Sequence, residues 1–285
     1  MAICETSPTS RAPRGAAALI LCGLLAACGT ARPVITVPKP VDEQAHVPDF
    51  ARKPFAPFAR QDAVAIAMRE WRAWGEYVDD LPPGSHPDLG EAKPERQPGL
   101  WQRVGEYWWL GQDVDALSNS WTGKHDTFGT VFPPSQDGEY AWSAAFISYI
   151  MRTDGAGTRF PYSPSHSTYI NIAAQMAQGT AANWAIIAMR PDSYAPQPGD
   201  LICTGREAAK TLRFESLPAG AYTSHCDIVV GISAEALSVI GGNVDDDVTM
   251  KHIPIDSAGR IAAPGNRVYD KRYPWMVVIR VLYDM

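Results

Sequence analysis

Three short motifs along the chain contain residue types that could carry out hydrolysis. Ser143 lies near the start of an apolar stretch, His225 stands just before a run of β-branched residues, and Asn243 follows two glycines. A serine hydroxyl becomes a nucleophile when a general base lies within hydrogen-bond reach. We predict that His225 is this base and that Asn243 holds its imidazole in the required tautomer, as in Cys-His-Asn arrangements.

The position of Ser143 favours this chemistry, because the stretch around it predicts the start of a helix. A helix N-terminus carries partial positive charge and free backbone N–H groups, which can bind a developing oxyanion. Each motif also has a structural interpretation: a satisfied core serine, a structural histidine, and a turn that uses glycine and asparagine. The order of the motifs, with Trp142 and Phe146 flanking the serine, favours a functional site.

Helices are predicted before strands. Periodic apolar residues indicate helices over residues 58–80, 99–113, 141–151 and 165–178. Strands are predicted at residues 184–189, 201–204, 227–232, 237–240, 248–253 and 276–283. This order is typical of an α+β domain with an antiparallel sheet, and we expect residues 58–285 to form a single such domain.

The N-terminal residues predict export and a lipid anchor. Two arginines precede an apolar run from Ala16 to Ala27 that is too short to span a membrane, and Cys28 follows it. We interpret residues 1–27 as a lipoprotein signal peptide and Cys28 as the lipidated residue; an ordinary secretory signal with an incidental cysteine is the alternative. Since Gly29 rather than an aspartate follows, the usual sorting pattern favours the outer membrane, on its periplasmic face.

A linker is expected between the lipid anchor and the domain. Residues 28–57 contain six prolines and no periodic pattern. Such a segment is extended and semi-rigid. It would hold the domain away from the membrane and close to the cell wall.

Cys203 and Cys226 are the cysteines that remain after removal of the signal peptide and lipidation of Cys28. In an oxidising periplasm they could form a disulfide between neighbouring strands; two buried thiols acting as small hydrophobic side chains are the alternative. They are too few for a zinc site. Residues 245–247 are all aspartate and could bind Ca²⁺, but they lack the spaced ligands of a calcium loop and fit a solvated turn. We therefore expect no metal and no cofactor.

Composition excludes one class of partner. The net charge is -6 and no cluster of lysine and arginine offsets it, which argues against nucleic-acid binding. Hydrophobic residues make up 46% of the chain, enough for a sizeable core.

The motifs carry a resemblance to known bacterial families. Residues 139–152, the stretch from Pro198 to Leu201, residues 225–229 and residues 241–243 resemble the bacterial domain-of-unknown-function family 2272. That family is in turn similar to the NlpC/P60 and CHAP cell-wall hydrolases. The resemblance implies a papain-like fold, cleavage of peptide or amide bonds in peptidoglycan, and Ser143 in the position of the nucleophilic cysteine.

Other side chains could line a substrate groove. Trp142 precedes the serine, and His166 and Tyr169 lie one helical turn apart; helix packing explains His166 and Tyr169 equally well. Trp101 and Trp108 fall on one helix face and are expected to pack in the core. Trp109 falls off that face and is expected to be exposed.

Two functions follow from these observations. In the first, a lipid-anchored hydrolase uses Ser143, His225 and Asn243 on a peptidoglycan amide through an acyl-enzyme. In the second, a degenerate hydrolase binds cell-wall peptide or a partner protein without turnover, because a hydroxyl replaces the thiol for which such a site is tuned. Retention of the histidine and the amide favours the first.

Overall fold

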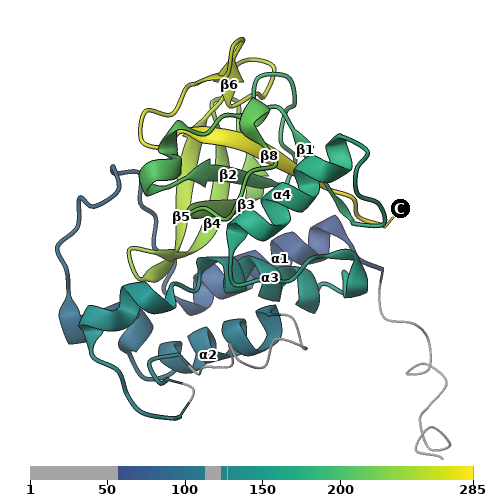
Figure 1. The fold of residues 1–285 in the computed structure, drawn as a ribbon. Coiled ribbons are helices and arrows are strands. Elements are labelled where there is room, and N and C mark those ends of the chain that lie inside the picture. The colour runs from purple at the N-terminus through teal and green to yellow at the C-terminus, as the bar shows by residue number, and fades with distance from the viewer. Residues whose placement is uncertain (1–56, 113–122, 127, 285) are drawn as a thin grey trace, which may run out of the picture. The chain divides into compact units, whose positions relative to one another are not determined.

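Helices precede strands along the chain, as the sequence predicted, and the two kinds of element form separate layers (Figure 1). The computed structural model describes residues 57–112, 123–126 and 128–284. The predicted signal peptide, Cys28 and the linker up to residue 56 lie outside these residues. Within the described part, no helix is both long and apolar enough to cross a bilayer. The fold class is α+β with an antiparallel sheet.

The described residues contain four α-helices: α1 (Arg60–Ala73), α2 (Leu100–Gly111), α3 (Ser143–Thr153) and α4 (His166–Ala177). The last three agree with the predicted ranges to within two residues at each end. The first ends earlier than predicted, because Gly75 and Glu76 adopt positive φ angles of 103° and 63°. This left-handed turn ends the helix. The chain then forms a bridge between Val78 and Met250.

Short segments of 3-10 helix occur in the connections between these elements. They are η2 (Gly90–Ala92), η3 (Pro94–Arg96), η5 (Pro134–Tyr140), η6 (Gly157–Arg159), η7 (Glu207–Thr211) and η8 (Phe214–Ser216). The last two lie in the segment from Arg206 to Tyr222, an insertion whose structure could not be read from the sequence.

A six-stranded antiparallel sheet follows the helices, with the strand order β1-β8-β2-β3-β4-β5. Its strands are β1 (Ile186–Met189), β2 (Leu201–Gly205), β3 (Ser224–Ile232), β4 (Ala236–Val244), β5 (Asp247–Pro254) and β8 (Trp275–Val281). A separate hairpin joins β6 (Ala262–Ala263) to β7 (Arg267–Val268). The sequence did not predict this hairpin, since two residues are too few to show an alternating pattern.

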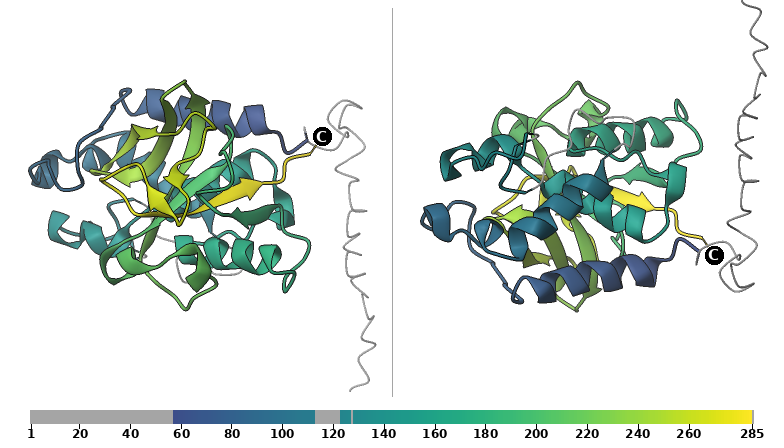
Figure 2. Two further views of the ribbon diagram at one scale, coloured as in Figure 1. Left: turned by 90° about the horizontal axis from the view of Figure 1, so that it is seen from above. Right: turned by 90° about the horizontal axis from the view of Figure 1, so that it is seen from below.

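Helix α3 is central to the core. Its residues from Ser143 to Met151 are all buried, and it packs against β3, β4, α1 and α2. In the view from below in Figure 2 the helices lie in front of the strands. The opposite face of the sheet has a second core that includes Val229, Ile261 and Trp275. The start of α3 is therefore held on several sides.

A buried carboxylate fixes the helices relative to one another. Glu70 in α1 accepts hydrogen bonds from Arg103 Nε at 2.8 Å and Tyr107 Oη at 2.7 Å in α2, and from Tyr149 in α3. Burial raises the pKa of Glu70, but the hydrogen bonds from Arg103 and Tyr107 outweigh it and hold the pKa below its usual value. The charged form is therefore retained where it links three helices.

Candidate functional site

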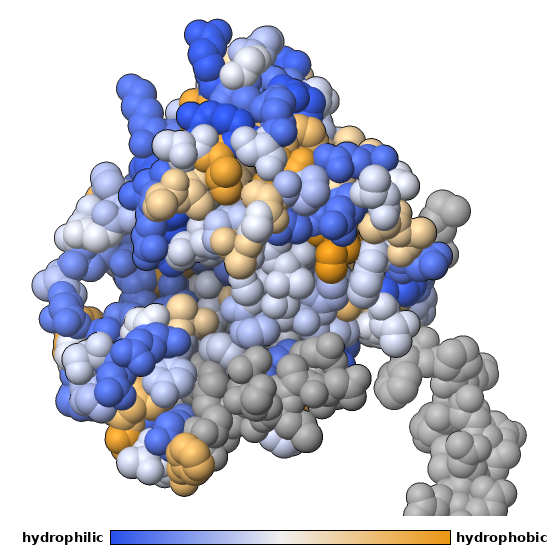
Figure 3. Space-filling model, in the orientation of Figure 1, coloured by the Kyte–Doolittle hydropathy of each residue, from blue (hydrophilic) through white to orange (hydrophobic). Residues whose placement is uncertain are grey.

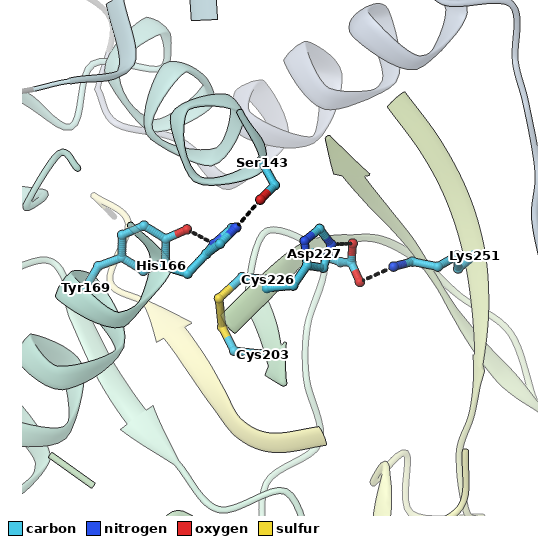
Figure 4. Close-up of a disulfide and its surroundings, with 8 residues drawn as sticks. Ser143, His166, Tyr169, Cys203, Cys226, Asp227 and Lys251 are labelled. Atoms are coloured by element: carbon cyan, nitrogen blue, oxygen red, sulfur yellow. Dashed lines mark hydrogen bonds and ion pairs between the residues drawn. A yellow bond between two sulfur atoms is a disulfide. The ribbon is translucent and has the colours of Figure 1, made fainter. Parts of the chain in front are cut away.

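Ser143 contacts a histidine that comes from α4. Ser143 is the first residue of α3, and His166 is the first residue of α4. His166 Nε2 lies 2.7 Å from Ser143 Oγ, and the other ring nitrogen of His166 is hydrogen-bonded to Tyr169 Oη (Figure 4). A hydroxyl, an imidazole and a phenol thus form one chain of hydrogen bonds, an arrangement that can activate a hydroxyl.

A second polar chain lies beside the first. His225 Nε2 is 2.8 Å from Asp227 Oδ1, and Lys251 Nζ is 2.7 Å from Asp227 Oδ2 (Figure 4). Lys251 is 1% exposed and its ammonium lies 4.8 Å from the centre of the Tyr273 ring. The rings of His166 and His225 stand 5.3 Å apart, centre to centre. The two chains therefore meet at the two histidines.

This geometry differs from the arrangement expected from the sequence. His166, rather than His225, bonds to Ser143. Asp227 takes the orienting position expected for Asn243, which lies half-buried at an irregularity of β4 with a φ of 55°. The sequence did contain the signal for Asp227, because alternate residues of a strand share a face and Asp227 is two residues beyond His225.

Two glycines of β4 make room for the site. A Cβ on Gly241 would lie 1.9 Å from Asp227 Oδ1 and 2.8 Å from His225 Nε2. A Cβ on Gly242 would lie 2.6 Å from the Phe146 ring. Strand β4 runs between β3 and β5, so the side chains of Asp227 and Lys251 meet across it where Gly241 has no side chain. The glycine at position 241 of the third motif therefore leaves the space that His225 and Asp227 occupy.

The structure joins Cys203 and Cys226 in a disulfide. They are direct partners in the register of β2 and β3, with Cα atoms 4.1 Å apart. Cys226 belongs to the core on the helix side of the sheet. Because neighbouring strand residues point to opposite faces, the disulfide stiffens β3 from the face opposite Asp227.

The charge states of the site follow from its burial. Burial, and after it the neighbouring His225, lowers the pKa of His166 well below its usual value. Burial also lowers the pKa of His225, against the opposing effect of Asp227. For Asp227 burial acts upward, but Lys251 and His225 outweigh it and hold its pKa far below the usual range. Near neutral pH the site therefore contains two neutral imidazoles and one carboxylate.

The site is enclosed. Ser143, His166 and His225 are at most 5% exposed, and Tyr169 is 0% exposed. Trp142 is 1% exposed, and its indole N–H donates to Glu95 Oε2 at 2.6 Å. The side chains predicted to line a groove are thus brought to the site, but as buried residues.

Several large apolar side chains of the described residues are exposed, among them Phe128 at 90%. Hydrophilic residues dominate the face in view in Figure 3, with small scattered hydrophobic patches. Trp109 is 63% exposed and Trp108 is 7% exposed, so the prediction is confirmed for these two. The prediction was wrong for Trp101, which is half-buried with its ring 4.7 Å from that of His125.

Comparison with known proteins gives one family. The family described as "Uncharacterized protein conserved in bacteria (DUF2272)" matches residues 95–281, which include every residue of the site. No curated protein and no solved structure matches the chain. The match covers most of the chain, and the protein therefore belongs to the DUF2272 family of uncharacterised bacterial proteins.

Proposed function

We propose that this protein is a serine hydrolase that cleaves an amide or peptide bond through an acyl-enzyme on Ser143. The observation that carries the proposal is the 2.7 Å hydrogen bond between Ser143 Oγ and His166 Nε2 at the start of a buried helix. His166 is the base in this proposal. The hydrogen-bonded pair of His225 and Asp227 lies next to it.

The geometry supplies each step. His166 Nε2 takes the proton of Ser143 while Oγ attacks the carbonyl carbon; this requires the tautomer in which Nδ1–H donates to Tyr169 Oη. The free backbone N–H groups of the first turn of α3 stabilise the oxyanion. The imidazolium then gives its proton to the leaving amine. Water, deprotonated by His166, releases the acyl group.

Asp227 contributes a counter-charge. Its carboxylate favours the protonated form of His166, and the same charge would stabilise the imidazolium formed in the transition state. Lys251 keeps this carboxylate ionised at a place where burial alone would protonate it.

Peptidoglycan stem peptides are the substrate class we propose. The support is the likeness of the motifs to the NlpC/P60 and CHAP hydrolases, together with a helix that presents its N-terminal residue to a histidine, as in a papain-like fold. Lipidation of Cys28 and location at the periplasmic face of the outer membrane belong to the same proposal, since the linker would bring the domain to the cell wall.

A second candidate is a binding module without turnover. Enclosure of Ser143, which is 5% exposed, and the hydroxyl in place of a thiol favour it. Such a protein would bind cell-wall peptide or a partner protein at the same site.

Labelling with a fluorophosphonate, followed by peptide mass spectrometry, tests the nucleophile. We expect modification of Ser143 in the wild type and none in Ser143→Ala. Ser148→Ala is the matched control, since Ser148 lies in the same helix, is 0% exposed and bonds to Ser163. His166→Gln should lower the labelling rate by about 10²–10⁴-fold, the usual contribution of a general base.

Digestion of purified peptidoglycan identifies the bond. Fragments released by the wild type and absent with Ser143→Ala would support the hydrolase. If the wild type releases no fragments and Ser143→Cys does release them, the binding module is favoured. Labelling that is unchanged in Ser143→Ala would refute Ser143 as the nucleophile.

A further inference from the structure

Three side chains from separate parts of the chain converge away from Ser143. They are Asp79 after α1, His86 in the following loop, and Asp245 in the turn between β4 and β5. One ligand atom of each lies within 4.8 Å of the ligand atoms of the other two. From the sequence, Asp245 was considered only with its neighbours as a calcium loop and no metal was expected, because Asp79 and His86 are distant from it in the chain.

Asp79 is the buried member. It is 4% exposed, and its backbone is fixed by a hydrogen bond from its N–H to the carbonyl of Met250 at 2.9 Å. Oδ1 accepts from the N–H of Leu81 at 2.8 Å. Oδ2 accepts no hydrogen bond from any residue that the structure describes, and it faces His86 Nε2 at 3.2 Å. Tyr77 Oη also lies 3.3 Å from this ring nitrogen. A carboxylate oxygen and an imidazole nitrogen 3.2 Å apart require a cation or a proton between them.

No lysine or arginine among the described residues pairs with Asp79 or Asp245. Lys93 lies 3.4 Å from Asp246 and 3.2 Å from Asp137. Lys93 thus pairs with the neighbouring acids, whereas the one basic side chain that pairs with Asp79 among the described residues is His86.

The cluster opens into a pocket. His86 and Asp245 line a pocket of about 560 Å³, together with Tyr77, Lys93, Asp246 and Asp247. In Figure 3 an opening remains between the loop that contains His86 and the body of the domain. A small ion with bound water can therefore reach the ligand atoms from solvent.

We propose that Asp79, His86 and Asp245 bind a divalent first-row transition-metal ion of the Zn²⁺ type. One imidazole nitrogen and two carboxylate oxygens suit Zn²⁺, whereas Ca²⁺ and Mg²⁺ prefer ligand sets of oxygen alone. Three protein ligands leave a coordination position for water or for a group in the pocket. This site is independent of the proposed hydrolase.

The ion would connect three segments. Asp79 is tied to Met250 within β5, Asp245 lies in the turn that precedes β5, and His86 belongs to the loop after α1. Binding to the folded state alone raises its stability. At a free Zn²⁺ concentration of 100 times the Kd, the Tm should rise by about 5–10 °C for a domain of this size.

The test uses the full chain without an affinity tag, stripped with a chelator that is then removed. ZnCl₂, MnCl₂, CaCl₂ and MgCl₂ are each titrated by calorimetry, and the Tm is measured with and without ZnCl₂. His86→Ala and Asp245→Asn are the variants, because both lie in exposed segments and should fold even if Asp79→Asn does not. His252→Ala is the matched control, since His252 Nδ1 pairs with Asp80 Oδ2 at 2.8 Å on the surface.

We expect one Zn²⁺ per chain and a rise in Tm, with His252→Ala equal to the wild type. His86→Ala and Asp245→Asn should each weaken Zn²⁺ binding by at least about 10-fold and abolish the rise in Tm. No saturable binding of Zn²⁺ below millimolar concentration would overturn the proposal, and would leave an imidazolium–carboxylate pair. Unchanged affinity in His86→Ala, or Ca²⁺ binding tighter than Zn²⁺ binding, would also overturn it.

Discussion

Replacement of Gly241 by alanine should disrupt the pair of His225 and Asp227. Gly241 does not have a positive φ, so alanine can adopt its backbone conformation without strain. The effect of the substitution is then purely steric. The added Cβ would stand 1.9 Å from Asp227 Oδ1, where an ordinary contact needs about 3.4 Å.

The magnitude follows from this overlap. Asp227 Oδ1 must move by about 1.5 Å, and the 2.8 Å hydrogen bond to His225 cannot survive this shift. Loss of a hydrogen bond to a charged group costs about 1.5–3 kcal/mol, and overpacking of a buried site costs about 1–3 kcal/mol. We expect the free energy of unfolding to fall by about 3–5 kcal/mol, equivalent to a decrease in Tm of about 6–20 °C.

Urea unfolding followed by circular dichroism, with a thermal scan beside it, measures the change. Gly231→Ala is the matched control: Gly231 lies in β3, and the nearest atom to its added Cβ would be Ser238 Cβ at an ordinary 3.6 Å. If the two variants unfold within about 0.5 kcal/mol of each other, the argument that Gly241 makes room for the hydrogen-bonded pair of His225 and Asp227 is refuted.

Three further perturbations test the buried charges and the disulfide. Burial raises the pKa of Glu95 to about 7, so the folded state holds a proton that the unfolded state loses near pH 4.5. Stability should therefore fall as the pH rises from 4.5 to 7, and urea titrations of Glu95→Gln should lack about 3 kcal/mol of this loss. Lys251→Met leaves the charge of Asp227 without its amino partner and should cost about 3–5 kcal/mol; a loss below 1 kcal/mol would contradict the pairing. Reduction of Cys203–Cys226 should lower stability by about 3 kcal/mol, since the bond closes a loop with a sequence separation of 23; equal Tm values with and without reductant would contradict this.

The local elements could be predicted from the sequence because they depend on short-range patterns. Apolar residues at helical spacing located α3 and α4, and alternation with turn residues located the six strands of the sheet. The start of α1 was also predicted, but not its end. Left-handed conformations at Gly75 and Glu76, and the bridge between Val78 and Met250, end the helix, and the bridge depends on a strand far along the chain.

The site was predicted in part. Ser143 at a helix start, His225 on a strand and the double glycine all lie at the site. The predicted hydrogen-bond partners of Ser143 and His225 were wrong, because the prediction used only the order of the motifs along the chain. Alternation within β3 could have identified Asp227 as the partner of His225. No pattern in the sequence could show that His166 would reach Ser143, since that contact depends on how α4 packs beside α3.

The sequence by itself determined which residues are polar within apolar surroundings, and on which element each of them lies. Tertiary structure decided which of them meet. The order of β3, β4 and β5 brings Lys251 to Asp227 across Gly241, and the turn between β4 and β5 brings Asp245 to Asp79 and His86. Periodicity is a property of neighbouring residues, whereas these contacts arise from the packing of segments that are distant in the chain.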